Sequence, residues 1–307
     1  MRVVSFLPSA TEMLYTLGVE PVGVSHECDY PPAVEELPTV NSSPVDPDGS
    51  TAEINQQVAD AQANGGVYEI DKQTLADLDP DVVVSQGICE VCAVDDGRIR
   101  DAVADLGLDA EVITTDPHSL EDVFDDLERL GRRLGREPQA EQAVADLQMR
   151  VRAIERATPA PEDGPDVAVF DWLDPVMVAG HWMPGLIERA GGRCELARHG
   201  APSRPREWDA IRAHDPDVIV AAPCGLDLDR TLADADDLAG RPGWETLTAV
   251  QTGRVYAMDG HDYANSPGPR LVDTLELLAG IITPGRDELP ASAVEQWPGL
   301  AANQPAD

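Results

Sequence analysis

Side chains able to bind a metal, transfer a proton or attack a carbon atom follow one another near the N-terminus. They belong to the stretch VGVSHECDYP, residues 22–31, which ends its apolar run in His26, Glu27, Cys28 and Asp29. The apolar part predicts a buried strand, so the four polar residues are expected where that strand passes into a loop. A residue set of this kind can form a metal site, a catalytic site or the lip of a binding cleft.

Cysteines form a second group of candidate residues. Cys89-x-x-Cys92 has a spacing shared by zinc sites and thiol redox motifs, but the chain has no second pair of this kind. A four-ligand metal site would therefore need Cys224 and either His26 or His181. Small buried thiols beneath a loop are the alternative interpretation of the same residues. A cysteine beside a histidine could also support hydrolysis or group transfer.

Aromatic residues gather in the stretch FDWLDPVMVAGHWMPGLIERAGG, although only 4% of the chain is aromatic. Trp172, His181 and Trp182 next to strand ends would offer a flat, amphipathic surface to a large conjugated ligand. Alternatively, each tryptophan fills core space. Arg270 precedes an amphipathic helix, where its charge opposes the helix dipole, so we expect its guanidinium to bind a ligand or one of the many carboxylates.

Short β-branched runs alternate with helical patterns, which predicts parallel strands joined by crossover helices. Strands are expected near residues 3–7, 21–24 and 82–85, and helices near 11–17 and 54–64. Ser9 and Glu12 have the spacing of a helix-capping box. Apolar spacing over residues 119–157 predicts two helices, the second starting at Pro138 and about 20 residues long.

The two halves of the sequence echo each other. LADLDPDVVVSQGIC ends at Cys89, and IRAHDPDVIVAAPC ends at Cys224. We therefore predict an α/β fold of two similar lobes with parallel sheets, bridged by one long helix. Expected boundaries are an N-terminal lobe at 1–136, a connecting helix at 137–158, a C-terminal lobe at 159–290 and a loose tail at 291–307. Ligands bind beyond the carboxyl ends of parallel strands, so the candidate residues should line one cleft between the lobes.

Composition excludes several partners. The 307 residues include 57 acidic and 22 basic ones, with a net charge of -35, and 42% of the chain is hydrophobic. So acidic a surface repels nucleic acid and anionic lipid headgroups, and it suits a halophilic host. No apolar run reaches the length of a membrane-spanning helix, so no membrane insertion is expected. Nucleotide-binding glycine loops and the HExxH and GxSxG motifs are absent from the sequence.

Several stretches together resemble a known family. RVVSFLPSATEMLYTLG, VGVSHECDYP, LDPDVVVSQGICEVCAV, GHWMPGLIERAGG, PDVIVAAPCG and PGPRLVDTLELLAG are similar, in this order, to the cobalamin-binding branch of the iron-siderophore and vitamin B12 substrate-binding protein superfamily. The resemblance implies two α/β lobes joined by a long helix, a corrinoid or metal chelate as ligand, and delivery to an ABC importer permease. It implies no enzymatic activity.

From the residues and the resemblance together we expect a cobalamin-binding protein, with a metal ion as a further candidate ligand. The expected ligand-binding residues are His26, Glu27, Cys28, Asp29, Cys89, Cys92, Trp172, His181, Trp182, Cys224 and Arg270, and the metal candidates are Cys89, Cys92, Cys224 and His181. The alternative is a cytoplasmic Cys/His enzyme, or a zinc or iron protein. Because no signal peptide or lipid-anchored cysteine is recognisable, the sequence as written predicts a cytoplasmic location, and the family's transport role predicts an extracytoplasmic one.

Overall fold

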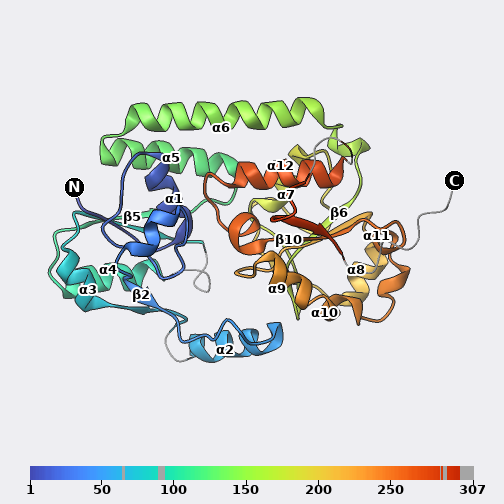
Figure 1. Cartoon of the computed structure of the whole chain (residues 1–307), viewed down its shortest axis with the longest axis horizontal. Coiled ribbons are helices and arrows are strands. Elements are labelled where there is room, and N and C mark those ends of the chain that lie inside the picture. Colours follow the sequence, from blue (N-terminus) through green and yellow to red (C-terminus); the bar gives the residue numbers. More distant parts are fainter. Residues whose placement is uncertain (64–65, 89–93, 284, 286–288, 298–307) are drawn as a thin grey trace. The chain divides into compact units, whose positions relative to one another are not determined.

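The computed structural model describes residues 1–63, 66–88, 94–283, 285 and 289–297. The chain divides into two compact units. Unit 1 comprises Met1–Gly49, Glu53–Pro117 and Glu121–Leu147, and unit 2 comprises Ser50–Ala52, His118–Leu120 and Gln148–Asp307. The division falls inside helix α6 (Glu137–Ala157), which Figure 1 shows as one continuous helix. Each unit is described separately below.

Unit 1 is built around a three-stranded parallel sheet with the order β1-β4-β5. Its strands are β1 (Val3–Ser5), β4 (Val82–Gln86) and β5 (Glu111–Thr115), with a separate pair β2 (Asn41–Ser42) and β3 (Glu69–Ile70). Its helices are α1 (Pro8–Thr16), η1 (Pro32–Glu36), α2 (Thr51–Ala63), α3 (Lys72–Leu78), α4 (Asp96–Asp105) and α5 (Leu120–Leu134). The predicted strand at 21–24 forms only single bridges, from Gly23 to Val4 and from Val24 to Thr39.

The helix starts of unit 1 differ in one place from expectation. Helix α1 begins at Pro8 with Leu7 as its N-cap and no capping side chain, so the predicted capping box at Ser9 and Glu12 is wrong. Both residues are buried within the first turns instead. Proline explains the early start, because its fixed φ suits the first helical position. The break between α5 and α6 lies at Gly135, which has a φ of 66°, and Pro138 lies in the first turn of α6 as predicted.

Unit 2 contains a six-stranded sheet with the order β11-β10-β9-β6-β7-β8. The strands are β6 (Val167–Leu173), β7 (Val176–Val178), β8 (Arg204–Pro205), β9 (Val218–Ala221), β10 (Val255–Met258) and β11 (Val294–Gln296). The helices are η2 (Pro161–Asp163), α7 (Met183–Arg189), α8 (Trp208–His214), α9 (Leu228–Ala233), α10 (Asp236–Ala239), η3 (Trp244–Thr246), α11 (Thr248–Gln251), η4 (Gly260–Ala264) and α12 (Leu271–Ile282).

The sheet of unit 2 contains the predicted parallel strands and further strands at its edges. Strands β10, β9 and β6 are parallel, and β7, β8 and β11 add antiparallel pairs at the two edges. The expected loose tail at 291–307 is wrong in its first part. Strand β11 pairs with β10, and Trp297 packs against Trp244 with only 3% of its surface exposed. Residues 298–307 lie outside the described part of the chain.

The sequence echo corresponds to a repeated local structure. In both units a helix ends at an aspartate with a left-handed backbone, Asp79 with φ 43° and Asp215 with φ 57°. A proline and a second aspartate follow. Asp81 accepts a hydrogen bond from the backbone N–H of Arg2 at 2.6 Å, and Asp217 accepts one from that of Asp166 at 2.8 Å. Each bond ties the start of β4 or β9 to the start of its parallel neighbour, β1 or β6.

Candidate functional site

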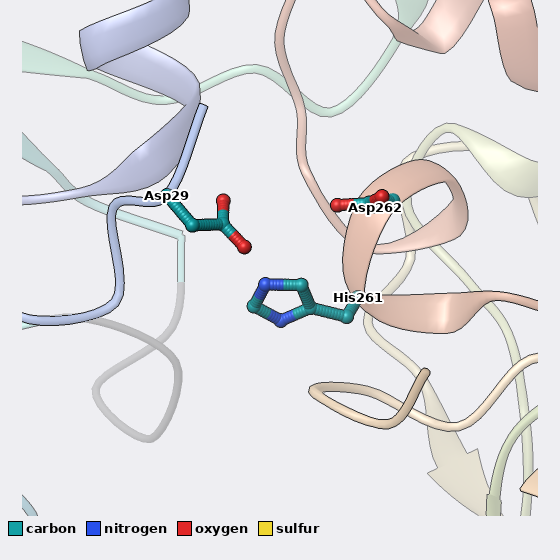
Figure 2. Close-up of side chains that lie close together, drawn as sticks. All are labelled: Asp29, His261 and Asp262. Atoms are coloured by element: carbon teal, nitrogen blue, oxygen red, sulfur yellow. The ribbon is translucent and has the colours of Figure 1, made fainter. Parts of the chain in front are cut away.

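In unit 1 the candidate residues His26 to Asp29 form the loop that follows the bridged residue Val24 (Figure 2 draws Asp29). Asn41 of β2 orders the start of this loop, since its Oδ1 accepts from the backbone N–H of His26 at 2.9 Å and lies 3.2 Å from His26 Nδ1. The hydroxyl of Tyr68 donates to Glu27 Oε1 at 2.9 Å. Backbone and side-chain contacts therefore hold this loop on β2 and on the segment before β3.

Cys28 faces the interior of unit 1. Only 8% of its surface is exposed, and its Sγ lies 3.2 Å from the hydroxyl of Thr11. Burial raises the pKa of the thiol to about 12, against the smaller lowering effect of the Thr11 contact. Cys28 is therefore a neutral thiol at physiological pH, the buried-thiol alternative of the sequence interpretation.

The expected metal site is not assembled by the described residues. Cys89 and Cys92 lie outside the described part of the chain, so their role stays a prediction. Among the residues that are described, neither Cys28 nor Cys224 belongs to a group of three side chains close enough to hold a metal ion. A zinc or iron site built on the Cys-x-x-Cys pair is therefore a question for elemental analysis of the purified protein.

In unit 2 the candidate residue Trp172 and its neighbour Asp171 lie within β6, at an irregularity in its pairing with β7. The loop after β9 joins them, because the backbone N–H of Cys224 donates to the carbonyl of Asp171 at 2.9 Å. Trp172 is half-buried, and its indole N–H donates to the carbonyl of Asp174 at 3.1 Å. The loop after β9 thus places Cys224 next to Asp171 and Trp172 of β6.

Asp171 is an unusual carboxyl group. Its Oδ1 is buried without a hydrogen-bond partner in the described residues, while Ser203 bonds the carboxyl group. Burial raises the pKa of Asp171 to about 6, and the hydrogen bond from Ser203 only partly offsets this effect. The Ser203 hydroxyl oxygen also accepts from the backbone N–H of Gly180 at 2.9 Å, which connects Asp171 to the next loop of the site.

That next loop carries His181 in a constrained conformation. His181 has a φ of 50°, a left-handed backbone that L-residues seldom adopt. Its N–H donates to the carbonyl of Ala201 at 2.6 Å, and its carbonyl accepts from the N–H of Gly200 at 3.0 Å. Gly180 passes so close that an added Cβ would lie 2.2 Å from the Ala201 oxygen. Strain maintained by paired backbone contacts is typical of residues whose side-chain direction matters.

The imidazole of His181 lies close to two aromatic rings and is nearly parallel to each of them. Its centroid lies 5.3 Å from that of His118 and 5.5 Å from that of Trp182. The Nδ1 atoms of the two histidines are 3.2 Å apart, which is hydrogen-bond distance when one nitrogen carries a proton and the other accepts. Trp182 is 9% exposed and donates its indole N–H to the Ala264 carbonyl at 3.0 Å. Trp182 therefore chiefly supports His181 from within the core.

A π-helical turn, η4, completes the loops at this end of the sheet. It carries His261 and Asp262 (Figure 2), and the Asp259 side chain accepts from the N–H of Asp262 at 2.7 Å. A Cβ on Gly260 would lie 2.1 Å from the Pro223 carbonyl oxygen, so only glycine lets η4 pack on the loop that carries Cys224. Arg270 Nη1 lies 3.3 Å from Asp262 Oδ1 and forms the carboxylate pair that was one of the two expectations for it.

Sequence reasoning missed His118, His261 and Asn265. His118 is 63 positions from His181, so no local motif connects them. The one available signal was that His118 follows the apolar strand β5. Asn265 donates to the carbonyls of Ala222 and Gly260, both at 3.0 Å, and so links the loop after β9 to η4. Such backbone-bridging roles leave no recognisable pattern in a single sequence.

Comparison with known proteins assigns the family. The profile of the periplasmic binding protein family matches residues 3–261. The chain belongs to this family. It is 24% identical over 290 residues to an uncharacterised ABC transporter substrate-binding lipoprotein, YvrC, of Bacillus subtilis, covering 92% of this chain and 80% of YvrC.

Solved structures show the same fold. A periplasmic haem-binding protein from Pseudomonas aeruginosa has a TM-score of 0.69 at 24% identity, covering 95% of this chain and 96% of that protein. The periplasmic vitamin B12-binding protein BtuF of Vibrio cholerae has a TM-score of 0.66 at 20% identity, covering 92% of this chain and 96% of that protein. These likenesses confirm the α/β fold predicted from the sequence.

Family membership also decides the general class of activity. Periplasmic binding proteins are non-enzymatic substrate-binding components of ABC transporters, so the prediction that this protein is not an enzyme is confirmed. They work outside the cytoplasm, in the periplasm or as lipoproteins. No helix in the described ranges combines the length and the apolar character that crossing a bilayer requires.

Proposed function

We propose that this periplasmic binding protein binds a metal tetrapyrrole, specifically a corrinoid of the cobalamin type, and presents it to an ABC importer. The observation that carries the proposal is His181 in the strand-end loops of unit 2, which has a left-handed backbone and lies close to the rings of His118 and Trp182. Solved structures of the same fold include proteins that bind haem and vitamin B12. The sequence resemblance to the cobalamin-binding branch favours the corrinoid.

The chemistry of His181 suits an axial ligand to cobalt. A histidine binds a transition metal through a neutral ring nitrogen, and a hydrogen bond at the other nitrogen orients the ring. If His181 donates its Nδ1 proton to His118, its Nε2 carries the lone pair for the metal. The stack with Trp182 and the two backbone bonds at Ala201 and Gly200 then fix the ring plane.

The other candidate residues take supporting roles in this proposal. Half-buried Trp172 offers part of its ring to the macrocycle, and Arg270 fixes Asp262 near the edge of the site. In unit 1 we propose His26, Glu27 and Asp29 as further ligand-binding residues. Cys28 belongs to the same loop, and its buried side chain anchors the loop in the interior of unit 1. Corrin amide side chains present both donors and acceptors, which such polar loops can match.

The test of ligand identity is a pair of titrations. Purified protein is mixed with hydroxocobalamin and, separately, with hemin, and each mixture is passed over a gel-filtration column while visible absorbance is recorded. We expect hydroxocobalamin to co-elute with the protein at about one per chain. Retention of hemin alone would replace the corrinoid with haem, and retention of neither would contradict the tetrapyrrole proposal.

We also propose an extracytoplasmic location and a high-salt environment for the protein. The family's transport role supports the first, because the ligand must be captured before import. The net charge of -35 supports the second, since screening by concentrated salt reduces repulsion among surface carboxylates. Fractionation of the source cells, with detection of the native protein by antibody, tests the location.

A further inference from the structure

A pocket of about 260 Å³ lies in unit 1 at the outer edge of its sheet. Strand β5 forms one wall and supplies Glu111, and helices α4 and α5 supply the arginines (all three elements are labelled in Figure 1). The lining residues are Arg100, Glu111, Val112, Ile113, Thr114, Arg129 and Arg133. Three arginines around one pocket are notable in a chain with 22 basic residues against 57 acidic ones.

Strand β5 presents a backbone edge to this pocket. It is an edge strand of the three-stranded sheet, and Glu111 and Thr115 direct their hydrogen bonds toward β4. Because these groups alternate along a parallel strand, Val112 and Thr114 point theirs the other way. Arg129 Nη2 donates to the Thr114 carbonyl at 2.6 Å, and Arg100 Nη2 donates to the Thr114 hydroxyl at 2.8 Å. The arginines are thereby held over the open edge.

The arginines retain unused donors after these contacts. A guanidinium has five N–H groups. The hydrogen bonds of Arg100 use Nε and Nη2, and those of Arg129 use Nη2, leaving both Nη1 groups without a partner among the described residues. Within the described ranges, the one ion pair of Arg133 is exposed, with Nη1 3.2 Å from Glu111 Oε1. The pocket therefore offers several converging cationic donors.

The carboxylates around the pocket differ in their hydrogen bonds and in their exposure. Asp96 accepts from Ser85 Oγ at 2.5 Å, from Arg100 Nε at 2.7 Å and from Thr114. Burial acts to raise the pKa of Asp96, but these hydrogen bonds together outweigh it and lower the pKa. Asp126 pairs with Arg129 while 7% exposed. Glu111 alone is a lining residue whose side chain is exposed, at 47%. An exposed pair of this kind contributes little free energy, so Glu111 is the carboxylate that an incoming anion would displace.

We propose that this pocket binds a phosphate-type oxyanion, held by Arg100, Arg129 and Arg133 at the open edge of β5. A tetrahedral dianion supplies more acceptor oxygens than Glu111 does and can accept from several guanidinium groups at once. The site is separate from the tetrapyrrole site of unit 2 and does not depend on that proposal. Free phosphate and the phosphate group of an ester share the required chemistry.

Isothermal titration calorimetry on the full chain tests the proposal, with inorganic phosphate and methyl phosphate as probes at constant ionic strength. Arg133→Gln removes a charge-assisted bond and should weaken binding by about tenfold or more. Glu111→Gln removes the competing carboxylate and should tighten binding several-fold. Arg132→Gln, a neighbouring exposed arginine of α5 that pairs with Glu128 and does not line the pocket, should leave it unchanged.

Arg133→Gln and Glu111→Gln are expected to change the affinity for phosphate in opposite directions. If Arg133→Gln folds poorly by circular dichroism, the Glu111→Gln result still decides. Tighter binding of inorganic phosphate than of the ester would assign free phosphate, and equal or tighter binding of the ester would assign a phosphate ester. Failure to bind either probe, equal weakening by Arg132→Gln and Arg133→Gln, or weaker binding by Glu111→Gln would overturn the proposal.

Discussion

At the scale of single residues, the buried carboxyl group of Asp171 distinguishes the site from a hydrophobic core. Its carboxyl group lies among the strand-end loops with Oδ1 unpartnered in the described residues, and burial raises its pKa to about 6. A carboxyl whose pKa is higher in the folded than in the unfolded chain binds its proton more tightly when folded. Its ionisation therefore lowers stability as pH rises from about 4 to about 6.

Asp171→Asn is expected to remove this pH-dependent cost. Asparagine keeps an oxygen for the Ser203 hydrogen bond and carries no charge. The free energy of unfolding of the variant relative to wild type should rise by about 1–3 kcal/mol between pH 4 and pH 7. Urea unfolding at both pH values measures it. A constant difference between the two proteins would contradict the assigned role of burial.

Buried Cys28 and partly buried Cys194 should resist alkylation. Burial raises the pKa of Cys28 to about 12 and that of Cys194 to about 11, so thiolate is scarce at neutral pH. With iodoacetamide at pH 7.5, peptide mapping should show slow labelling of both, and fast labelling only after denaturation. Rapid labelling of Cys28 in the folded protein would instead support the reactive-thiol alternative considered from the sequence.

Residue types at strand ends could be predicted from the sequence, whereas their partners could not. Trp172 and Cys224 were expected near strand ends, and the structure places Trp172 in β6 and Cys224 in the loop after β9. His118 was missed because its contact with His181 depends on tertiary packing. Trp182 was expected to offer its face to a ligand, a role that stays a prediction; in the structure it is buried and bonds the Ala264 carbonyl through its indole N–H.

At the scale of elements, the repeated Asp-Pro-Asp segments were predictable because both sequence and structure recur. The antiparallel strands β7, β8 and β11 were not, since two or three residues carry too little periodicity to reveal a strand. The capping box failed because Pro8 starts α1 earlier than Ser9 could cap it. Two helix-start signals, Pro8 and Ser9, thus compete here, and the helix begins at the earlier one.

The repeated segments allow a matched comparison. Asp79 and Asp215 both have left-handed backbones, where glycine relieves strain. Asp215 additionally accepts from the N–H of Thr248 at 2.7 Å and from its hydroxyl at 2.8 Å. Asp215→Gly should therefore cost about 1–3 kcal/mol more than Asp79→Gly in chemical unfolding. Equal effects would show that the Thr248 bonds contribute nothing net.

At the scale of the whole molecule, charge dominates the expected behaviour. The chain has 57 acidic residues against 22 basic ones, so repulsion among carboxylates exceeds the attraction within ion pairs such as Arg150 with Glu276. Raising KCl from about 0.1 M to about 1 M shortens the screening length from about 10 Å to about 3 Å. We expect the melting temperature to rise over this range, measured by calorimetry. A fall would mean that screened ion pairs outweigh the repulsion.

The central claim is that His181 binds the metal of a captured tetrapyrrole. The most direct measurement is an absorbance titration with hydroxocobalamin of wild type, His181→Ala and His199→Ala. His199 pairs with Glu188 at 2.8 Å and serves as the control. We predict that the visible bands shift on binding to wild type and to His199→Ala, and that His181→Ala loses the shift. An unchanged shift in His181→Ala, or none in wild type, would contradict the account.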